Sequence, residues 1–406
     1  MHGKFRPWFA VDGCFFPSYR LSRKSRIRGR ITSGGAKGER DDGTMDDGLS
    51  GHGRTAQMKV RSAMSAPAAF LLLSLLLAPV PAPRADEGPR LYPVVVKGKW
   101  GYIDNTGKVA IEPRFGAAFN FSDGLAPVQV GSGREGKRGY VDRTGKVVIP
   151  PQYDWAGNFR EGLANVRIGN RMGYIDRKGR TVVPVTYPGN YPFSDGMGMV
   201  VDSSYKFGFV DRGGKVVIPP KYESAFGFSE GMAVAVTGGR GMYIDRKGKV
   251  VLDTSRFDAV MPFFEGRAIA MIADRWGFLD NTGQVVIETK WDGAFPFSDG
   301  LAAVNRGGKF AQVPTPHIAG GKWGFVDPSG TVAIEPAFDF VRKFSEGMCP
   351  VMEKEMWGYI GRNGKFVIPP RFDEAQEFQG GLARVKTGGK IGYVDKTGRY
   401  VWEPTE

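Results

Sequence analysis

Two rows of carboxylates recur along this 406-residue sequence at nearly constant spacing. The first row, called here the turn aspartates, precedes a short turn that ends in glycine: Asp104, Asp142, Asp176, Asp211, Asp245, Asp280, Asp327 and Asp395. The second row, called the rim carboxylates, directly precedes another glycine: Asp123, Glu161, Asp195, Glu230, Glu265, Asp299 and Glu346. Paired carboxylates hydrolyse glycosides when their surroundings set the two pKa values apart. A carboxylate present in every unit is explained more simply as a turn residue, and the clustered Asp and Asn ligands of a calcium loop are missing.

A row of cations follows the turn glycine and could bind a polyanion by charge. This basic row consists of Lys108, Lys146, Arg180, Lys215, Lys249, Lys365 and Arg399, and it is interrupted by Gln284 and Thr331. Constant spacing would place the seven side chains along one edge of the molecule, where an acidic glycan, lipopolysaccharide or teichoic acid could dock. The alternative is that these cations solvate the turns and protect strand edges from pairing.

Histidine and cysteine offer little chemistry. Three His and two Cys in the whole chain exclude a His/Cys zinc cluster and a disulfide framework. His317 lies in an irregular stretch, residues 305–322, without a partner Cys or a nucleophile motif. We expect this histidine to be inert and treat the stretch as a candidate binding loop. We therefore expect no catalytic residue, no metal and no cofactor.

The first 85 residues differ in composition from the rest. Residues 1–57 hold a basic run and Gly/Ser/Asp-rich stretches without apolar periodicity, which predicts no packed unit. Residues 58–85 have the layout of a secretory signal peptide: a positive start, an apolar segment at 66–78 that is too short to span a membrane, and Ala85 as the cleavage position. We interpret residues 1–57 as lying upstream of a true start at Met58. The alternative is a basic cytoplasmic tail before an uncleaved anchor.

Loss of this segment changes the charge of the protein. Residues 1–85 hold 14 of the 56 Lys and Arg and 6 of the 42 Asp and Glu, so the formal net charge falls from +14 to +6. Export would place the protein in the periplasm, on the cell surface or outside the cell, with no stable membrane span after cleavage. It would also separate the protein from nucleic acid, which we therefore do not expect as a partner. Cys349 would be left without a second Cys for an internal disulfide.

The elements that position these rows form a repeat. An opening of the type x-Gly-aromatic-aliphatic-Asp, with Trp or Phe first in five units, recurs nine times with the local departures given below. Its second position falls at residues 101, 139, 173, 208, 242, 277, 324, 358 and 392. A Gly turn follows, then a β-branched strand such as residues 147–149, and a Pro that is predicted to stop the pairing. A segment ending in Phe-Ser-Asp/Glu-Gly leads to an alternating strand such as residues 163–168, with Ala164, Val166 and Ile168 on the buried face.

This unit resembles the WG (KWG) repeat of bacterial proteins, and the resemblance covers residues 91–406. Its signature positions are Trp100, Gly101, Gly139, Gly173, Gly208, Trp276, Gly277, Trp323, Gly324, Trp357, Gly358 and Gly392. The sequence departs from the pattern where Gly241-Met242 replaces Trp-Gly, Gly361 replaces Asp and Gln379-Gly380 replaces Ser-Glu. The resemblance implies an exported or envelope-associated all-β protein that mediates interactions, with no enzymatic activity attached to the repeat. Because the aromatic residues share one register in every unit, we expect them in the core and not on a glycan-stacking surface.

The repeat count leaves two architectures open. The array starts with an isolated strand at residues 91–97 and ends after the first hairpin of its ninth unit, a phase that suits either a closed propeller-like ring or a capped open solenoid. Nine units exceed the usual four to eight blades, and about 35 residues are few for a four-stranded blade. The sequence therefore favours an open or gently curved all-β array of nine hairpin repeats over a closed ring.

The functional prediction follows from export and repetition together. We expect a non-enzymatic binding or scaffold module at the bacterial cell envelope, with a protein or an anionic envelope polymer as its partner. Two alternatives remain: a hydrolase of envelope polysaccharide or peptidoglycan that uses loop carboxylates or His317, and a purely structural repeat protein.

Overall fold

The computed structural model describes residues 90–131, 133, 136–311 and 317–405. Within these ranges the chain forms strands and no helix, so the predicted all-β repeat fold is confirmed. No helix of a length and apolarity that would cross a membrane occurs among these residues. The predicted upstream segment, residues 1–57, and the predicted signal peptide, residues 58–85, lie outside the described residues.

The strands group into nine antiparallel sheets, called blades 1 to 9 in chain order. Blade 1 has three strands: β1 (Tyr92–Val96), β2 (Lys99–Ile103) and β3 (Val109–Phe115). Blades 2 to 5 have four strands each: β4 (Ala117–Ala118), β5 (Ala126–Val130), β6 (Lys137–Val141) and β7 (Val147–Tyr153); β8 (Trp155–Ala156), β9 (Leu163–Ile168), β10 (Arg171–Asp176) and β11 (Thr181–Tyr187); β12 (Gly189–Asn190), β13 (Met197–Val201), β14 (Phe207–Asp211) and β15 (Val216–Tyr222); β16 (Ser224–Ala225), β17 (Ala233–Thr237), β18 (Arg240–Ile244) and β19 (Val250–Leu252).

Blades 6 to 9 continue the same order: β20 (Ala259–Phe264), β21 (Arg267–Ile272), β22 (Arg275–Leu279) and β23 (Val285–Trp291); β24 (Gly293–Ser298), β25 (Leu301–Ala311), β26 (His317–Val326) and β27 (Val332–Phe338); β28 (Phe340–Val341), β29 (Met348–Glu353), β30 (Met356–Gly361) and β31 (Phe366–Phe372); β32 (Glu374–Ala375), β33 (Leu382–Thr387), β34 (Lys390–Asp395) and β35 (Tyr400–Thr405). Each blade therefore joins the last part of one sequence unit to the opening hairpin of the next, and blade 1 has no first strand within the described residues.

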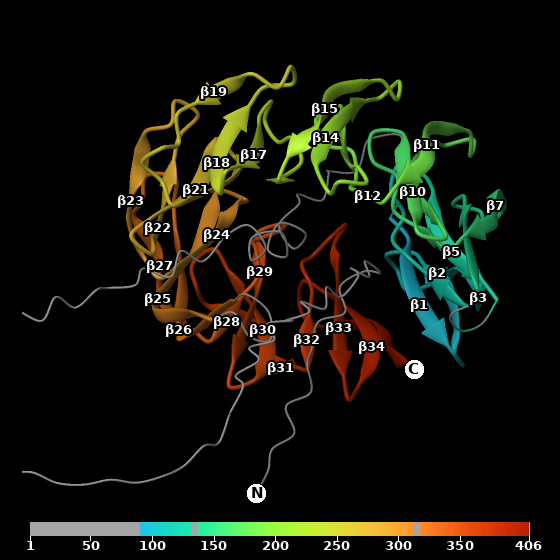
Figure 1. Cartoon of the computed structure of the whole chain (residues 1–406). Coiled ribbons are helices and arrows are strands. Elements are labelled where there is room, and N and C mark those ends of the chain that lie inside the picture. Colours follow the sequence, from blue (N-terminus) through green and yellow to red (C-terminus); the bar gives the residue numbers. More distant parts are fainter. Residues whose placement is uncertain (1–89, 132, 134–135, 312–316, 406) are drawn as a thin grey trace, which may run out of the picture. The chain divides into compact units, whose positions relative to one another are not determined.

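The nine blades close into a ring, with β1 lying beside the strands of blade 9 (Figure 1). The Tyr393 hydroxyl donates to the carbonyl oxygen of Pro93 at 2.8 Å, and the Thr405 hydroxyl donates to that of Val95 at 2.6 Å. The sequence-based preference for an open or curved solenoid is therefore wrong, and the propeller-like ring is the architecture. A four-stranded blade fits into about 35 residues because the first strand of most blades has two residues and the turn after the second strand is equally short, as at Gly169-Asn170.

The proline after the β-branched strand does not end the strand. In blade 1, Trp100 of β2 pairs with Phe115 of β3, while Tyr102 pairs with Ile111. Between these two pairs β3 has two more residues than β2, and they form a bulge. Pro113 lies in this bulge, where a backbone donor is not needed. The predicted stop at proline is therefore wrong, and pairing resumes at the following aromatic residue.

The bulge explains the glycine of each opening. A Cβ atom on Gly208 would lie 2.6 Å from the carbonyl oxygen of Ile218, because the bulged strand crosses directly over this position. Blade 5 is the exception, since Met242 replaces the glycine there. Its last strand, β19, has 3 residues, whereas the last strands of the neighbouring blades have 7.

The aromatic residues of the openings lie in the core. Trp276, Trp323 and Trp357 are buried, and Trp100 is half-buried. The strand at residues 163–168 departs from the predicted pattern, because Ile168 is 49% exposed at the strand end, where it pairs with Arg171 beside a turn.

Candidate functional site

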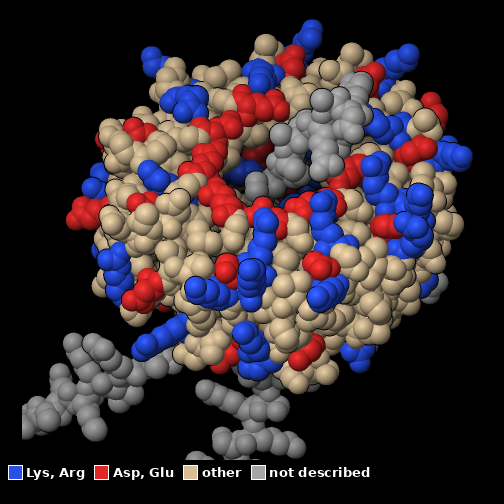
Figure 2. All heavy atoms as spheres, turned by 90° about the horizontal axis from the view of Figure 1, so that it is seen from above, with Lys and Arg blue, Asp and Glu red and all other residues tan. Residues whose placement is uncertain are grey.

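Both carboxylate rows and the basic row lie at one end of the blades, called here the turn face. In an antiparallel blade, the loop after the first strand and the turn after the third strand emerge at the same end. The first strands lie toward the ring centre and the last strands toward the outside (Figure 1). The rim carboxylates, which follow the first strands, are thus the inner row, and the basic row, which opens the last strands, is the outer one. Figure 2 shows Asp and Glu side chains gathered around the central opening of the molecule.

The turn aspartates hold the turns, as predicted. Asp104 Oδ1 accepts hydrogen bonds from the backbone N–H of Thr106 at 2.8 Å and of Lys108 at 3.1 Å. The same pair of bonds recurs at Asp142 and at Asp280. The hydroxyl of Thr106 holds the pKa of the Asp104 carboxyl below its ordinary value, because it donates a hydrogen bond to the ionised form.

The rim carboxylates join neighbouring blades, a role that the sequence analysis missed. The backbone N–H of Gly162 in blade 3 donates to Asp123 Oδ2 of blade 2 at 2.7 Å. The next junction has the same bond, from Gly196 N–H to Glu161 Oε2 at 2.8 Å. Asp123 adopts a left-handed conformation, with φ of 50°, which turns its carboxylate toward the next blade. The signal in the sequence was the similar spacing between each carboxylate and the glycine of the next unit, 34 to 39 residues except for 48 residues between Asp299 and Gly347.

Two further bonds recur at the junctions between blades. The Ser122 hydroxyl of blade 2 donates to the Phe159 carbonyl oxygen of blade 3 at 2.6 Å. The Tyr102 hydroxyl of blade 1 donates to the Phe119 carbonyl oxygen of blade 2 at 2.8 Å, and the tyrosine ring packs against Phe121 with centroids 4.8 Å apart. Each junction thus combines a buried aromatic pair with polar bonds to the adjoining backbone.

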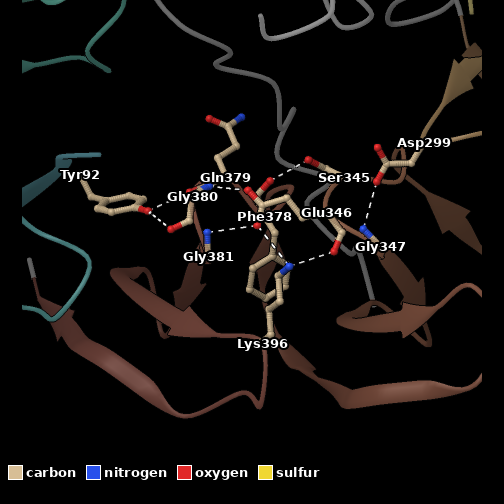
Figure 3. Close-up of polar contacts among 10 residues, drawn as sticks. All are labelled: Tyr92, Asp299, Ser345, Glu346, Gly347, Phe378, Gln379, Gly380, Gly381 and Lys396. Atoms are coloured by element: carbon tan, nitrogen blue, oxygen red, sulfur yellow. Dashed lines mark hydrogen bonds and ion pairs between the residues drawn. The ribbon is translucent and has the colours of Figure 1, made fainter. Parts of the chain in front are cut away.

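The junction between blades 9 and 1 closes the ring with a different set of polar groups (Figure 3). Gly380 stands where the other blades have a rim carboxylate, and Gln379 stands in place of Ser. The Tyr92 hydroxyl of blade 1 donates to the carbonyl oxygens of Gln379 at 2.9 Å and Gly380 at 2.7 Å. Burial raises the pKa of Tyr92 to about 12. Its ring packs edge-on against Tyr393 with centroids 5.4 Å apart, as a Phe does at the other junctions.

The junction before it, between blades 8 and 9, keeps the regular pattern (Figure 3). Glu346 accepts hydrogen bonds from the backbone N–H groups of Gly380 and Gly381. Lys396, from the turn of blade 9, forms an ion pair with the Glu346 carboxylate at 3.3 Å and donates to its backbone carbonyl at 3.0 Å. A turn cation of one blade therefore neutralises the rim carboxylate of the preceding blade.

All seven members of the basic row are exposed, at the start of the last strand or just before it in seven different blades. Their backbone N–H groups bond to the turn aspartates, or in blade 8 to Asn363. Arg180 pairs with Asp176 at 2.6 Å and Arg399 pairs with Asp395 at 3.4 Å. The row therefore follows the outer edge of the turn face and does not converge on a pocket.

The described parts of the stretch at residues 305–322 extend β25 and β26, which pair as far as Ala311 and His317. They emerge at the end opposite the turn face, and both His317 and Phe310 are exposed there. Cys349 is buried in β29, where burial raises the pKa of its thiol. Among the residues that the structure describes, no group of three or more His, Cys, Asp or Glu side chains could hold a metal ion.

Comparison with known proteins decides the family. The family described as a WG containing repeat matches residues 100–133, 139–171, 172–202, 207–240, 242–275, 276–310, 323–355 and 357–390. The chain belongs to the WG-repeat family. No curated protein matches the sequence.

Solved structures resemble this WG-repeat propeller in fold. The crystal structure of the eukaryotic initiation factor matches with a TM-score of 0.55 and 11% identity, over 77% of this chain and 94% of that chain. Weaker matches include BamB from Moraxella catarrhalis, with a TM-score of 0.35 and 14% identity over 71% of this chain and 95% of that chain. The Neurospora crassa Pan2 WD40 domain matches with a TM-score of 0.34 and 12% identity over 69% of this chain and 85% of that chain. At such identities the likeness concerns the fold alone.

Proposed function

We propose that this WG-repeat propeller is an exported, non-enzymatic binding or scaffold module at the bacterial cell envelope. The observation that carries the proposal is the use of both carboxylate rows within the fold. The turn aspartates accept turn amides, and the rim carboxylates accept amides of the next blade, as at Asp104 and Asp123. A general acid for glycoside hydrolysis needs a raised pKa. Each Asp or Glu pKa shift resolved in the described residues is downward.

Export rests on the signal-peptide layout of residues 58–85. Peptide mass spectrometry of the protein isolated from its native cells tests this part. We expect the mature N-terminus after Ala85 and no tryptic peptide from residues 1–57. Peptides from that segment would contradict the proposed start at Met58 and favour a cytoplasmic tail before an uncleaved anchor.

Affinity capture from the envelope fraction, combined with an activity screen, tests the binding role. The intact exported protein is incubated with peptidoglycan and with envelope polysaccharides, and both the retained mass and the chain length of each polymer are measured. A binding module retains a polymer or a protein partner and leaves polymer length unchanged. Shortened polymer would establish the hydrolase, and the absence of any retained partner would leave a purely structural role.

A further inference from the structure

Ring closure changes the neighbours of the basic row. In the sequence, Gln284 and Thr331 divide the row into a group of five and a pair. In the ring, blade 9 adjoins blade 1, so Lys365 and Arg399 come directly before Lys108. The seven cations therefore occupy one uninterrupted arc that runs through blades 8, 9, 1, 2, 3, 4 and 5. We call this stretch of the turn face the basic arc.

The other turn residues follow the same division. The position after the turn aspartate holds a cation in five blades of the arc, at Arg143, Arg177, Arg212, Arg246 and Lys396. In blade 8, Arg362 occupies the same position after Gly361, and Lys178 and Lys247 follow in two of the other blades. The turns of the arc thus contain 15 cations against 6 aspartates. The turns of blades 6 and 7 contain one aspartate each and no cation, with Asn281 and Pro328 after the aspartates. The positive charge of these turns is therefore confined to one side of the ring.

Part of this charge is used inside the fold. Arg212 lies 3.8 Å from the Glu161 carboxylate and Arg246 lies 4.0 Å from that of Asp195, so the inner turn cations offset the rim carboxylates of the preceding blades. The lysines of the basic row lie further out and are exposed. In the described part of the chain, their ammonium groups do not reach a carboxylate within ion-pairing distance. Their charge is thus directed to solvent and to solutes.

The opposite end of the blades shows a different arrangement. Cations of the third strand pair there with an aspartate of the following connection, as in Lys322 of β26 with Asp339 at 2.6 Å and in Arg275 of β22 with Asp292. The charge at that end is compensated locally at these positions. The turn face is therefore the one that offers an extended line of lysine ammonium groups.

The surroundings of the row favour a polymer without bases. Binding of single-stranded nucleic acid needs exposed aromatic rings on which bases stack. The exposed apolar residues beside the row are valines, such as Val147, Val216 and Val250, and one aromatic ring, Phe366 next to Lys365. The aromatic residues of the openings are buried, as in Tyr140 and Tyr174. Charge spacing along an edge that offers one exposed ring and no series of stacking platforms among its described residues fits a flexible chain with an anionic group on successive units.

We propose that the basic arc binds an extended anionic glycan polymer that carries carboxylate or phosphate groups. This inference rests on the proposed binding role and names its surface and its ligand class. The polymer follows the outer edge of blades 8, 9 and 1 to 5 and crosses the junction where the chain ends meet. Blades 6 and 7 form the gap in this surface.

Binding is measured with the full exported protein by fluorescence anisotropy at several salt concentrations. The labelled probes are polygalacturonate for carboxylate, wall teichoic acid for phosphate, neutral dextran and oligothymidylate. We expect one or both anionic glycans to bind, and dextran not to bind. Oligothymidylate that binds as tightly as the glycans would overturn the assignment to glycan, and failure of both anionic glycans to bind would overturn the inference as a whole.

Three triple variants locate the surface. Lys146→Gln, Lys215→Gln and Lys249→Gln together should weaken glycan binding about tenfold and lower the salt slope by about 3. The matched control, Lys99→Gln, Arg171→Gln and Arg240→Gln, removes the same charge at the opposite ends of blades and should change affinity less than about twofold. Lys365→Gln, Arg399→Gln and Lys108→Gln together should match the first variant, because the arc continues across the closing junction. Equal losses for the first variant and its control, or no loss for the third variant, would overturn the arc.

A gain of affinity completes the test. Gln284→Lys with Thr331→Lys closes the gap in blades 6 and 7 and should tighten glycan binding about threefold, because both new cations extend the same edge. Unchanged affinity would show that the polymer does not follow the edge. Circular dichroism and melting curves confirm that each variant is folded. Failure of the arc leaves the binding role intact if a protein partner is captured from the envelope, so the two proposals fail separately.

Discussion

The internal junctions of the ring and the closing junction between blades 9 and 1 share one aromatic contact and differ in their polar groups. At both kinds of junction an opening tyrosine donates to a carbonyl oxygen of the next blade, as Tyr140 does to Gly157 at 2.7 Å and Tyr393 does to Pro93 at 2.8 Å. The internal junctions from blades 2 and 3 to blades 8 and 9 add a rim carboxylate that accepts a glycine amide. The closing junction has no such carboxylate and instead uses the Tyr92 hydroxyl, which donates in the reverse direction.

The difference follows from the missing first strand of blade 1. Among the residues that the structure describes, blade 1 offers no Phe-Ser-Glu-Gly loop whose glycine amide could bond to a carboxylate of blade 9. A carboxylate at position 380 would therefore have no such donor, and Gly380 leaves space for Tyr92. A Cβ atom on Gly380 would lie 2.8 Å from the Tyr92 hydroxyl oxygen. The departure from the repeat at Gln379-Gly380 is thus an adaptation to closure and not a weakened unit.

The largest effect is expected from truncation of the junction aromatics. Tyr92→Ala at the closing junction and Phe159→Ala at an internal junction each remove a buried ring and should each lower the free energy of unfolding by about 3–5 kcal/mol. Only the closing junction lacks a chain connection between its two blades, so Tyr92→Ala should also raise hydrogen exchange in blades 1 and 9. Exchange mass spectrometry with Phe159→Ala as the control measures this. If Tyr92→Ala raised hydrogen exchange in blades 1 and 9 no more than Phe159→Ala does, the closing junction would not be easier to open than an internal one.

A second prediction restores the carboxylate at the closing junction. Gly380→Glu should lower the free energy of unfolding by about 1–3 kcal/mol, because the new side chain collides with Tyr92. The left-handed conformation alone does not explain such a loss, since Glu346 adopts it with φ of 54°. In a Tyr92→Ala background the added cost of Gly380→Glu should shrink. A double-mutant cycle by urea denaturation checks this, and additive losses would show that Tyr92 is not the cause.

A smaller loss of stability, equal at both kinds of junction, is expected from removal of the tyrosine hydroxyl that they share. Tyr393→Phe and Tyr140→Phe each remove a buried hydroxyl and leave a carbonyl oxygen without its donor, so each should cost about 1–2 kcal/mol. Denaturant unfolding of the two variants provides the comparison. A much smaller loss for Tyr393→Phe would mean that the closing junction is looser than the internal ones.

The smallest effect is the loss of stability at low pH, which should be the same for turn aspartates beside the closing junction and beside internal junctions. The turn aspartates have pKa values below the ordinary Asp value, for instance through the Thr106 hydroxyl at Asp104 and the Thr282 hydroxyl at Asp280. Their contribution to stability is therefore present above the unfolded pKa of about 4 and is lost as pH falls through the lower folded value. Melting temperatures of Asp104→Asn, beside the closing junction, and Asp280→Asn should lose their difference from wild type below about pH 4. Different acid profiles for the two variants would show that the closing junction titrates separately.

Much of the local structure could be predicted from the sequence. The turn aspartates accept the amides that the Asp-x-x-Gly pattern indicated, and the register of the strands follows the aromatic-Gly openings. The interpretation of the rim carboxylates as turn residues was incomplete, because their partners lie in the next blade, as with Glu161 and Gly196. The predicted end of pairing at proline was wrong, because a bulge accommodates a residue without an N–H group. Export, the absence of enzymatic activity and the ligand of the basic row stay predictions.

The sequence by itself determined nine β units, their turns and the members of each charged row, because strand alternation, glycine conformation and Asx turns depend on residues close together in the chain. Only the tertiary structure decided that the array closes. Closure depends on the angle between packed blades and on contacts such as that of Tyr393 with Pro93, which lie 300 residues apart in the chain. The same closure joins Arg399 to Lys108 in one line of charge, a neighbourhood that no local pattern contains.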